Sequence, residues 1–522
     1  MGEEILQFYR EKLKKEYKIA FISTFIIVML VHIYKFTNSL PNHDTVYNYY
    51  ANQNMIGSGR WALSWACGMS SYYDLPWING LMSCIFISLT VVVIVALFKM
   101  KNPVLIGLTG GLLAAAPATT ETIFFLFTAD GYMVSMFLAA LGVYFSRIEE
   151  KSKLKLVLGI VCICVSCGIY QAYVSFALIL AICYFINELL KNNYEKKEYF
   201  KWIFKQIIVY TIALASYYVI WKLSMRFTGV AANSYQGISE VGKIKKGFIK
   251  EGLLRSIKPI ALYFLQWNVF RYGFTLYSVL NLIFLGTMFL GMIISVIKSG
   301  IFKRVWAMIL VIFCLIAIVP FSCIWNFASS TVEYRLMMLQ CLTVLFILTA
   351  VLYEQWFKPI LKNAVCLLLL VIVINNAIMA NISYFYMNLC YEQTYATGLE
   401  MISKIHNLDD KYDFEKIAVL GNIQDRFKYE KFNKETGEIL PMSKVYMFTS
   451  LLEENLLYDS YHVTKFLRTT FGLDLINLSK ENRNKLLDDK RVKAMKTWPS
   501  DESINVVDDI LVIKLSEDKE GE

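Results

Sequence analysis

Charged residues are scarce in this chain of 522 residues, where they make up only 18% of the sequence. Hydrophobic residues make up 57%, and the mean hydropathy is +0.47. Soluble domains are roughly a quarter charged, and a soluble chain of this length would normally divide into two or more domains. The composition therefore argues against an ordinary soluble enzyme and favours a membrane protein.

The motifs of soluble enzymes are also missing. The sequence has no GxxxxGK(S/T) phosphate loop, no GxSxG nucleophile turn and no HExxH zinc motif. Its four His residues are scattered, and its 11 Cys residues all lie in or beside apolar runs, from Cys67 to Cys390. No disulfide framework is expected and no cofactor is implied. Polar residues in and beside the apolar runs must therefore carry the chemistry.

Long apolar runs are what the chain has in abundance. A helix of about 20 apolar residues crosses the ~30 Å hydrocarbon core of a bilayer. We therefore predict an α-helical polytopic membrane protein with about 11 transmembrane helices. Two runs are short, since one ends at Pro117 and the other begins at Gly131, and such helices often border a cavity. The runs lie near 19–36, 78–98, 103–118, 131–146, 154–169, 171–190, 206–225, 273–297, 304–322, 336–353 and 361–385.

Basic residues predict the orientation of these helices. Residues 1–18 mix apolar and basic side chains, which predicts an amphipathic cytoplasmic segment on an anionic inner leaflet. With this end inside, Lys and Arg concentrate in the inner loops and are absent from 119–130. An odd number of helices then places the C-terminus outside. The net charge of +10 thus mostly reflects membrane topology, and no nucleic-acid partner is expected.

The long outer loop 226–272 is a basic exception to this pattern. Long loops translocate despite their charge, so the exception is permitted. Within it, FIKEGLLRSIKPIALYFLQWNVF predicts an amphipathic helix along the outer surface. The basic residues are either a solvated loop or an electrostatic guide for an anionic lipid.

The composition changes near residue 387, where long apolar runs stop. We predict three parts: the segment 1–18, a transmembrane domain 19–386 and a small extracytoplasmic α/β domain 387–522. The last part can bury a modest core but shows no catalytic motif. Its expected strands are 416–421, 444–448 and 509–515, and its expected helices are 391–407 and 448–458.

Polar candidates all fall on the predicted outer side, where ionisable groups near lipid are functional candidates. We expect them to share one outward-facing cavity. The predicted catalytic residues are Asp44 in the first outer loop and Glu121 and Asp130 in the second. The predicted donor-phosphate and sugar-binding residues are Arg60, Tyr132, Tyr170, Gln171, Glu333 and Arg335.

These residue types fit sugar transfer from a polyprenyl phosphate. An acceptor hydroxyl needs a carboxylate base within hydrogen-bond reach, which predicts that role for Asp44. The departing phosphate needs cationic donors, and Arg60 or Arg335 could hold it bidentately. Two alternatives stay open: structural ion pairs or helix-end groups, and a divalent cation held by Asp44, Glu121 and Asp130 together.

Three segments carry a family resemblance. NHDTVYNYYANQNMIGSGRW, YDLPWINGLMSCIFISL and AAAPATTETIFFLFTADGYMVSMFLAALGVYF occur in this order, and TWPSDESINVVDDILVIKL closes the chain. In these segments the chain resembles the bacterial glucosyltransferase family typified by type II O-antigen, serotype-converting glucosyltransferases. The resemblance is clearest over about 40–175 and fainter toward the end.

The resemblance implies a GT-C-like membrane glycosyltransferase. Such an enzyme takes a sugar, here glucose, from an undecaprenyl-phosphate donor and passes it to a cell-surface glycan on the outer face. Asp44 occupies the place of the essential acid in the first outer loop, Asp130 that of a second acid, and Arg335 a place near the donor phosphate. The acceptor is O-antigen or another cell-wall glycan.

Two other functions remain open at this stage. A transporter or flippase of lipid-linked sugar would use a similar basic loop and aromatic cavity, but such proteins are often built from repeats. No repeat is evident, and the polar residues crowd one side. An O-antigen polymerase or ligase would be expected to rely on a large outer loop with paired arginines instead.

Overall fold

The structure, a computed structural model, describes residues 14–240, 247–266, 275–409, 412–422, 448, 456–457 and 459–517. The chain divides into two compact units. We call Met1–Thr37 with Asn52–Asn381 the helical unit, and Asn38–Ala51 with Ile382–Glu522 the sheet unit. Several predictions lie wholly or partly outside the described residues: most of the segment 1–18, parts of the loop 226–272, nearly all of the strand 444–448 and of the helix 448–458.

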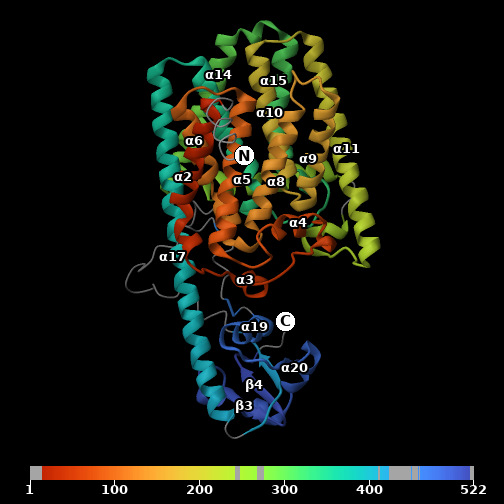
Figure 1. Cartoon of the computed structure of the whole chain (residues 1–522), viewed down its shortest axis with the longest axis vertical. Helices are drawn as coiled ribbons and strands as arrows, with labels where there is room; N and C mark the ends of the chain where they lie inside the picture. Colours follow the sequence, from red (N-terminus) through yellow and green to blue (C-terminus); the bar gives the residue numbers. More distant parts are fainter. Residues whose placement is uncertain are drawn as a thin grey trace, which may run out of the picture. The chain divides into compact units, whose positions relative to one another are not determined.

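Spanning helices dominate the helical unit (Figure 1). Nine helices in the described part of the chain are long and apolar enough to cross a membrane. A tenth span results if the bent pair α6 and α7, Pro103–Ala114 and Pro117–Phe124, counts as one. The nine are α2 (Lys15–Thr37), α5 (Pro76–Phe98), α8 (Leu126–Phe145), α10 (Tyr173–Lys191), α11 (Lys196–Thr228), α14 (Leu276–Ser299), α15 (Val305–Ser322), Leu336–Trp356 and α17 (Pro359–Asp409).

The predicted fold class is confirmed, and each apolar run corresponds to a helix. The run 154–169 is α9, Lys153–Ile169, whose 17 residues place it at the lower limit for a spanning helix. The run 103–118 breaks at Pro117, the first residue of α7, and the two helices meet at 44°. Proline suits a first helical position because that position needs no backbone donor.

Shorter elements connect these helices. They are α3 (His43–Asn48), η2 (Ile56–Ser58), α4 (Leu63–Gly68), η3 (Tyr235–Glu240), α12 (Phe248–Leu265), η4 (Ile301–Lys303) and η5 (Ile324–Phe327). The span Leu336–Trp356 itself consists of η6 (Leu336–Leu342) and α16 (Thr343–Trp356). The helix α12 falls within the predicted amphipathic segment of the long loop. Its helical character is confirmed for Phe248–Leu265.

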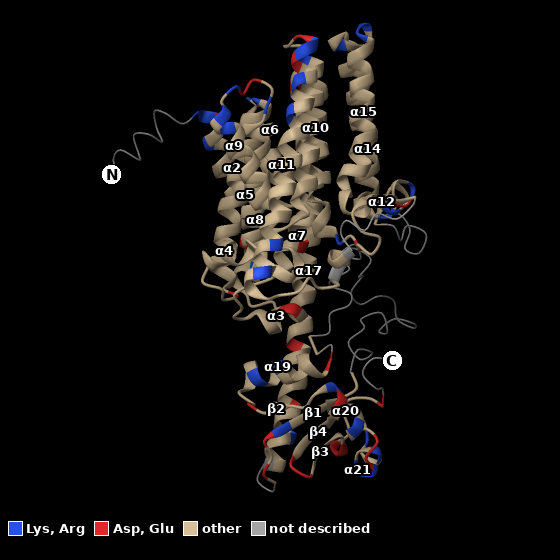
Figure 2. Cartoon of the chain, turned by 90° about the vertical axis from the view of Figure 1, so that its right-hand side faces the viewer, with Lys and Arg blue, Asp and Glu red and all other residues tan. Residues whose placement is uncertain are grey.

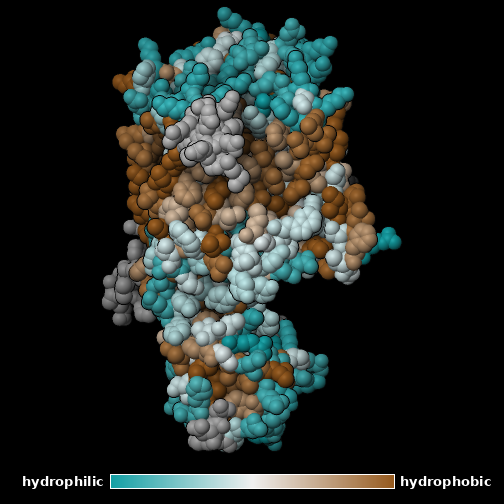
Figure 3. All heavy atoms as spheres, viewed as in Figure 1, coloured by the Kyte–Doolittle hydropathy of each residue, from teal (hydrophilic) through white to brown (hydrophobic). Residues whose placement is uncertain are grey.

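Small residues bring the helices of this unit close together. A side chain at Gly142 of α8 would lie 2.5 Å from Ile163 and 3.2 Å from the carbonyl of Gly159, both on α9. Close approach of this kind is typical of membrane helices, which pack through small residues rather than through the hydrophobic effect. The unit's outer surface carries a wide apolar belt (Figure 3). Such a belt suits lipid.

The predicted inner loops meet at one end of the helical unit, where Lys and Arg gather (Figure 2). Lys99, just after α5, lies 3.2 Å from Glu149 in the turn between α8 and α9. Lys205 of α11 donates to the carbonyl of Arg147 at 2.7 Å. We call this the basic end. Further contacts there join Lys101 and Asn102 to Glu354, Arg304 to Asn192, and Lys298 to Trp356.

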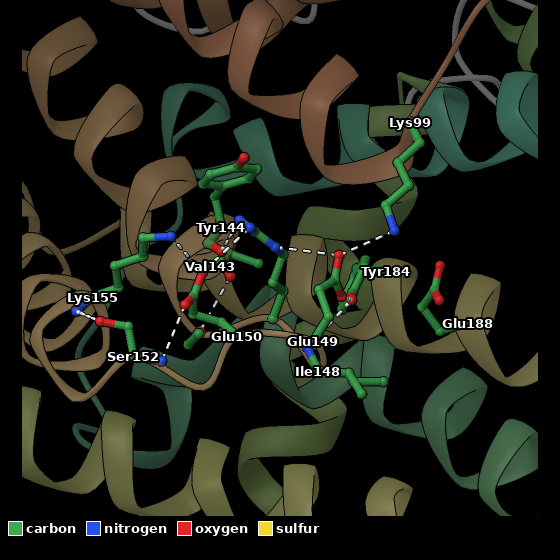
Figure 4. A network of polar contacts seen from close by, with 12 residues as sticks. Lys99, Val143, Tyr144, Ile148, Glu149, Glu150, Ser152, Lys155, Tyr184 and Glu188 are labelled. Atoms are coloured by element: carbon green, nitrogen blue, oxygen red, sulfur yellow. Dashed lines mark hydrogen bonds and ion pairs between the residues drawn. The ribbon is translucent and has the colours of Figure 1, made fainter. Parts of the chain in front are cut away.

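Glu149 and Glu150 centre a polar network at the basic end (Figure 4). The Tyr184 hydroxyl donates to Glu149 at 2.7 Å, and Lys155 lies 3.1 Å from Glu150. Burial raises the pKa of Glu149, but hydrogen bonds from Tyr184 and Lys99 outweigh it and lower the pKa below 4.5. Its stabilising contribution is therefore present above that pH and is lost as the pH falls through the lowered pKa.

Replacing Glu149 with Gln should lower the free energy of unfolding by about 1–3 kcal/mol near neutral pH, because charge-assisted hydrogen bonds are lost. The measurement is the thermal unfolding temperature of detergent-purified protein. The difference from wild type should shrink as the pH falls below 4.5. Glu198→Gln, an exposed carboxylate on α11, is the control. Equal effects of both substitutions would contradict the role of the network.

The sheet unit has a four-stranded sheet in the order β2-β1-β4-β3. Strands β1 (Lys416–Leu420) and β4 (Ile510–Lys514) confirm two predicted strands and pair in parallel. Strand β2 (Ile476–Asn477) pairs in parallel with β1. Strand β3 (Ile504–Val507) pairs antiparallel with β4. The unit's helices include α19 (Ser460–Phe471), α20 (Lys480–Leu486) and α21 (Lys490–Ala494).

Alternation along β1 divides the core between the two faces of the sheet. Ile417 and Val419 pack with residues of α17 and α19 in one cluster. Ala418 and Leu420 pack in a second cluster that includes Val492 of α21. This is the two-residue period of a strand covered on both faces.

The segment 38–51 was predicted as part of the transmembrane domain but belongs to the sheet unit. Its short helix α3 packs on α19, and Val46 is fully buried in the same core cluster as Val463 and Phe466. The N-cap Asn42 and Thr45 form a capping box at the start of α3. A single valine in a polar loop forms no sequence pattern, so nothing around Val46 predicts that it packs against α19.

Candidate active site

The predicted outer loops of the helical unit meet at Gln171, which precedes α10 at the end opposite Lys191 and the basic end. Its side-chain amide donates to the carbonyl of Ser58 at 2.7 Å and to the hydroxyl of Tyr217 at 3.1 Å. The indole of Trp325 donates to the backbone carbonyl of Gln171 at 3.1 Å. Three segments that are distant in sequence, η2, α11 and η5, thus share one buried residue.

Arg60 lies beside this junction against two stacked tyrosines. The rings of Tyr132 and Tyr170 are 4.2 Å apart and nearly parallel. The guanidinium of Arg60 lies 4.9 Å from the ring centre of Tyr170 and donates to the Tyr132 hydroxyl at 2.8 Å. Cation–π contacts and a hydrogen bond together fix the plane of the guanidinium. The structure therefore brings together four of the predicted binding residues: Arg60, Tyr132, Tyr170 and Gln171.

The segment of Glu333 and Arg335 joins the same end through its neighbours. The hydroxyl of Tyr334 accepts a hydrogen bond from the backbone of Trp325 at 3.0 Å. Burial raises the pKa of Tyr334, and Tyr170 is among its electrostatic neighbours. Tyr334 therefore remains a neutral hydroxyl close to the stacked tyrosines. Glu333 is exposed and Arg335 half-buried.

Glu121 is fully buried and ties α7 to η6. Its carboxylate accepts a hydrogen bond from the backbone N–H of Met337 at 2.6 Å. Thr119, two residues earlier, donates to Gln340 at 3.1 Å. The position of Glu121 therefore fixes the start of the helix that follows Arg335, a positioning role that sequence alone did not predict.

Asp130 is fully buried on another face of α8. Residues two apart on a helix do not face each other, so Asp130 and Tyr132 lie on different sides. Asp130 accepts hydrogen bonds from the backbone of Gly131 at 2.8 Å and from the hydroxyl of Ser70. Gly131 permits this contact, because a side chain there would lie 2.9 Å from the sulfur of Cys67. Asp130 thus belongs to a contact between α4 and α8.

Two further ionisable residues near Asp130 were not singled out from the sequence. Asp74, just before α5, interacts electrostatically with Asp130 and with Lys35, which is 2% exposed in the last turn of α2. Burial raises the pKa of Asp74, and Lys35 opposes that shift. The sequence does mark both residues. Asp74 is an acid beside a predicted membrane helix, as Asp44 is, and Lys35 interrupts an apolar run.

Asp44 lies in the sheet unit, unlike the other predicted site residues. Its side chain is 46% exposed and lies 3.4 Å from the His43 ring. The backbone carbonyl of Asp44 accepts a hydrogen bond from Asn48. Among the described residues, no group of three or more His, Cys, Asp and Glu is arranged to hold a metal ion.

The apolar belt and the spanning helices define a polytopic membrane protein. A family model described as glucosyl transferase GtrII matches residues 33–338 of the 522, more than half of the chain. The chain therefore belongs to the GtrII glucosyl transferase family, and the predicted family is confirmed. Its architecture is consistent with a GT-C-like glycosyltransferase. Neither a curated protein nor a solved structure matches the sequence significantly.

All nine predicted site residues fall inside the matched range, whereas the strands of the sheet unit lie beyond it. The matched range also includes Ser70 and Asp74. The family match therefore covers both the junction around Gln171 and the buried acids near α4.

Replacing Gly59 with Ala should disturb the junction around Gln171. Gly59 has a φ of +77°, and a side chain there would collide with the Tyr217 hydroxyl and lie 2.6 Å from the Gln171 amide nitrogen. We expect a loss of about 1–3 kcal/mol in unfolding free energy and reduced glucosyl transfer.

Thermal unfolding and a transfer assay measure the two effects of Gly59→Ala. The matched control is Gly286→Ala in α14, where a side chain would meet nothing within 4 Å. Wild-type stability in Gly59→Ala would show that the junction does not depend on this glycine.

Proposed function

We propose that this enzyme transfers glucose from an undecaprenyl-phosphate-linked donor to a cell-surface glycan at the outer face of a bacterial cell membrane. The observation that carries the proposal is the convergence of Arg60, Tyr132, Tyr170 and Gln171 at one end of the helical unit. Membership of the glucosyl transferase family supports the reaction type.

The orientation of the site in the membrane follows from charge. Loops rich in Lys and Arg remain cytoplasmic, so we assign the basic end to the cytoplasm together with the N-terminus. The end that carries Arg60 then faces outward, and so does the C-terminal sheet unit. A lipid-linked donor would reach this end with its polyprenyl chain along the apolar belt and its phosphate at the polar boundary.

The donor is proposed to bind through its phosphate and its sugar. An arginine fork matches two phosphate oxygens, which suits Arg60 and Arg335. Tyr132 and Tyr170, whose stacked rings are 4% and 5% exposed, are proposed to form an aromatic wall for the sugar. Gln171 and Glu333 are proposed to offer groups for its hydroxyls.

Asp44 is proposed as the general base. It takes the proton of the acceptor hydroxyl, whose oxygen forms a bond to the anomeric carbon of glucose. The bond from that carbon to the phosphate oxygen breaks, and the electron pair leaves with undecaprenyl phosphate. Glu121 and Asp130 are proposed to support this chemistry as the further acidic residues, Glu121 by holding the segment after Arg335 in place.

Replacing Asp44 with Asn should lower transfer about 10²–10⁴-fold, since an amide cannot accept the proton. The measurement is mass spectrometry of surface glycan from cells that lack the gene and carry either the wild-type or the mutant copy. Wild type should add one hexose to the glycan, and Asp44→Asn should not. Asp413→Asn, an exposed acid of the sheet unit, is the control.

Two outcomes would contradict this assignment. Normal hexose addition by Asp44→Asn would remove Asp44 as the base. A transporter would be favoured if cells that lack the gene accumulate unflipped lipid-linked sugar while their membranes keep normal hexose transferase activity.

Replacing Arg60 with Ala should weaken donor binding about 10–100-fold, because a charge-assisted contact to phosphate is lost. Arg60→Lys should recover only part of the affinity, since Lys keeps the charge but not the fork. Arg335→Ala should behave like Arg60→Ala. Binding of purified donor to detergent-solubilised enzyme measures the effect, with Arg468→Ala on α19 as the control. Unchanged donor affinity in either variant would refute that residue's phosphate role.

A further inference from the structure

Two short stretches of chain from opposite ends of the sequence form one surface of the sheet unit. Helix α3 packs against α19, and Val46 of α3 is buried together with Val463 and Leu467 of α19. Several side chains next to these buried residues reach the surface. We call this the α3–α19 surface, formed by His43, Asp44, Tyr47, Asp459 and Tyr461, with the buried His462 packed against Tyr47.

Two tyrosines form the centre of the α3–α19 surface. The rings of Tyr47 and Tyr461 stack with centres 4.7 Å apart and an angle of 7°. Tyr47 also meets His462 edge-on at 4.3 Å. Tyr461 remains 54% exposed although one partner covers it. An aromatic ring held rigidly by its neighbours and open to solvent is suited to bind the apolar face of a ligand.

Two aspartates flank these tyrosines, and each is paired with a histidine. Asp44 and Asp459 are 46% and 45% exposed. One oxygen of Asp459 accepts both the backbone N–H and the ring nitrogen of His462, at 2.8 and 2.7 Å. The backbone N–H of Tyr461 also contributes a hydrogen bond to this carboxylate. Asp459 therefore caps α19 while part of its carboxylate remains exposed to solvent.

Tyr47 lies within the field of both aspartates. Burial raises the pKa of Tyr47, and Asp459, Tyr461 and Asp44 add to the shift. Burial also raises the pKa of Asp459, but the hydrogen bonds from His462 outweigh it, so the net pKa is lowered. The surface thus combines two aspartates with two tyrosines, a combination that disfavours anionic ligands.

We propose that the α3–α19 surface binds the acceptor saccharide. A neutral glycan fits this chemistry, because sugar hydroxyls donate to carboxylates and the C–H face of a sugar ring covers an aromatic ring. The anionic donor phosphate does not fit it. The inference rests on the proposed function, in which Asp44 hydrogen-bonds the acceptor hydroxyl and the adjoining sugar units therefore lie beside Tyr461 and Asp459.

The first test is steady-state kinetics of the full-length enzyme with glycan isolated from cells that lack the gene. Tyr461→Ala should raise the KM for this glycan about tenfold and leave the KM for the donor unchanged. Tyr461→Phe should keep near-wild-type values, because the ring remains. Tyr412→Ala, which removes a comparably exposed tyrosine of the sheet unit, is the control.

The second test measures binding without turnover. The same glycan is fluorescently labelled, and its affinity is measured for wild type and for Asp459→Ala. We expect Asp459→Ala to bind it severalfold more weakly. Thermal unfolding checks that each variant is folded. An acceptor KM in Tyr461→Ala equal to that of Tyr412→Ala, or a change confined to the donor KM, would overturn the inference.

The two assays separate this inference from the proposed function. Absence of transfer by the wild-type enzyme would refute the proposed function, while the binding assay would still decide whether the surface recognises the glycan. Normal transfer with unaltered acceptor KM and binding in the variants would refute only the acceptor site.

Discussion

The hydrogen bonds of Gln171 are the contacts on which the geometry at this end of the helical unit depends. Its two N–H groups serve Ser58 and Tyr217, and its backbone carbonyl accepts from Trp325. A buried amide of this kind is stabilising only when its partners are in place, since each unpaired polar group costs about 1–3 kcal/mol. Hydrogen bonds to and from Gln171 therefore help to hold the loops that carry Arg60 and Tyr334 in place.

The convergence of Arg60, Tyr132, Tyr170 and Gln171 could be predicted from the sequence, because alternating helices place every second loop at the same end. The helix positions followed from apolar length alone. The grouping of Asp130 could not be predicted in the same way, since loop membership does not reveal which face of α8 a side chain occupies. Asp130 contacts Ser70 instead of the stacked tyrosines.

Contacts between segments far apart in the chain could not be predicted from the sequence either. Helices at 361–385 and 391–407 were expected separately, yet α17 runs unbroken from Pro359 to Asp409, because neither glycine nor proline interrupts the residues between them. Of the four strands in the sheet unit, β1 and β4 were predicted from their apolar pattern, whereas β2 and β3 were not. The partnership of Val46 with α19 leaves no local periodicity to detect, so the placement of Asp44 in the sheet unit could not be anticipated.

The contribution of α3 to the sheet unit has a consequence for biosynthesis. Residues 43–48 leave the ribosome long before their partner α19, residues 460–471. At about 5–20 residues per second, the delay is about 20–80 s, during which Val46 lacks its partners on α19. The sheet unit thus cannot complete its core until the chain is nearly finished. An enzyme cut short by premature termination would keep its spanning helices but would lack a folded setting for Asp44.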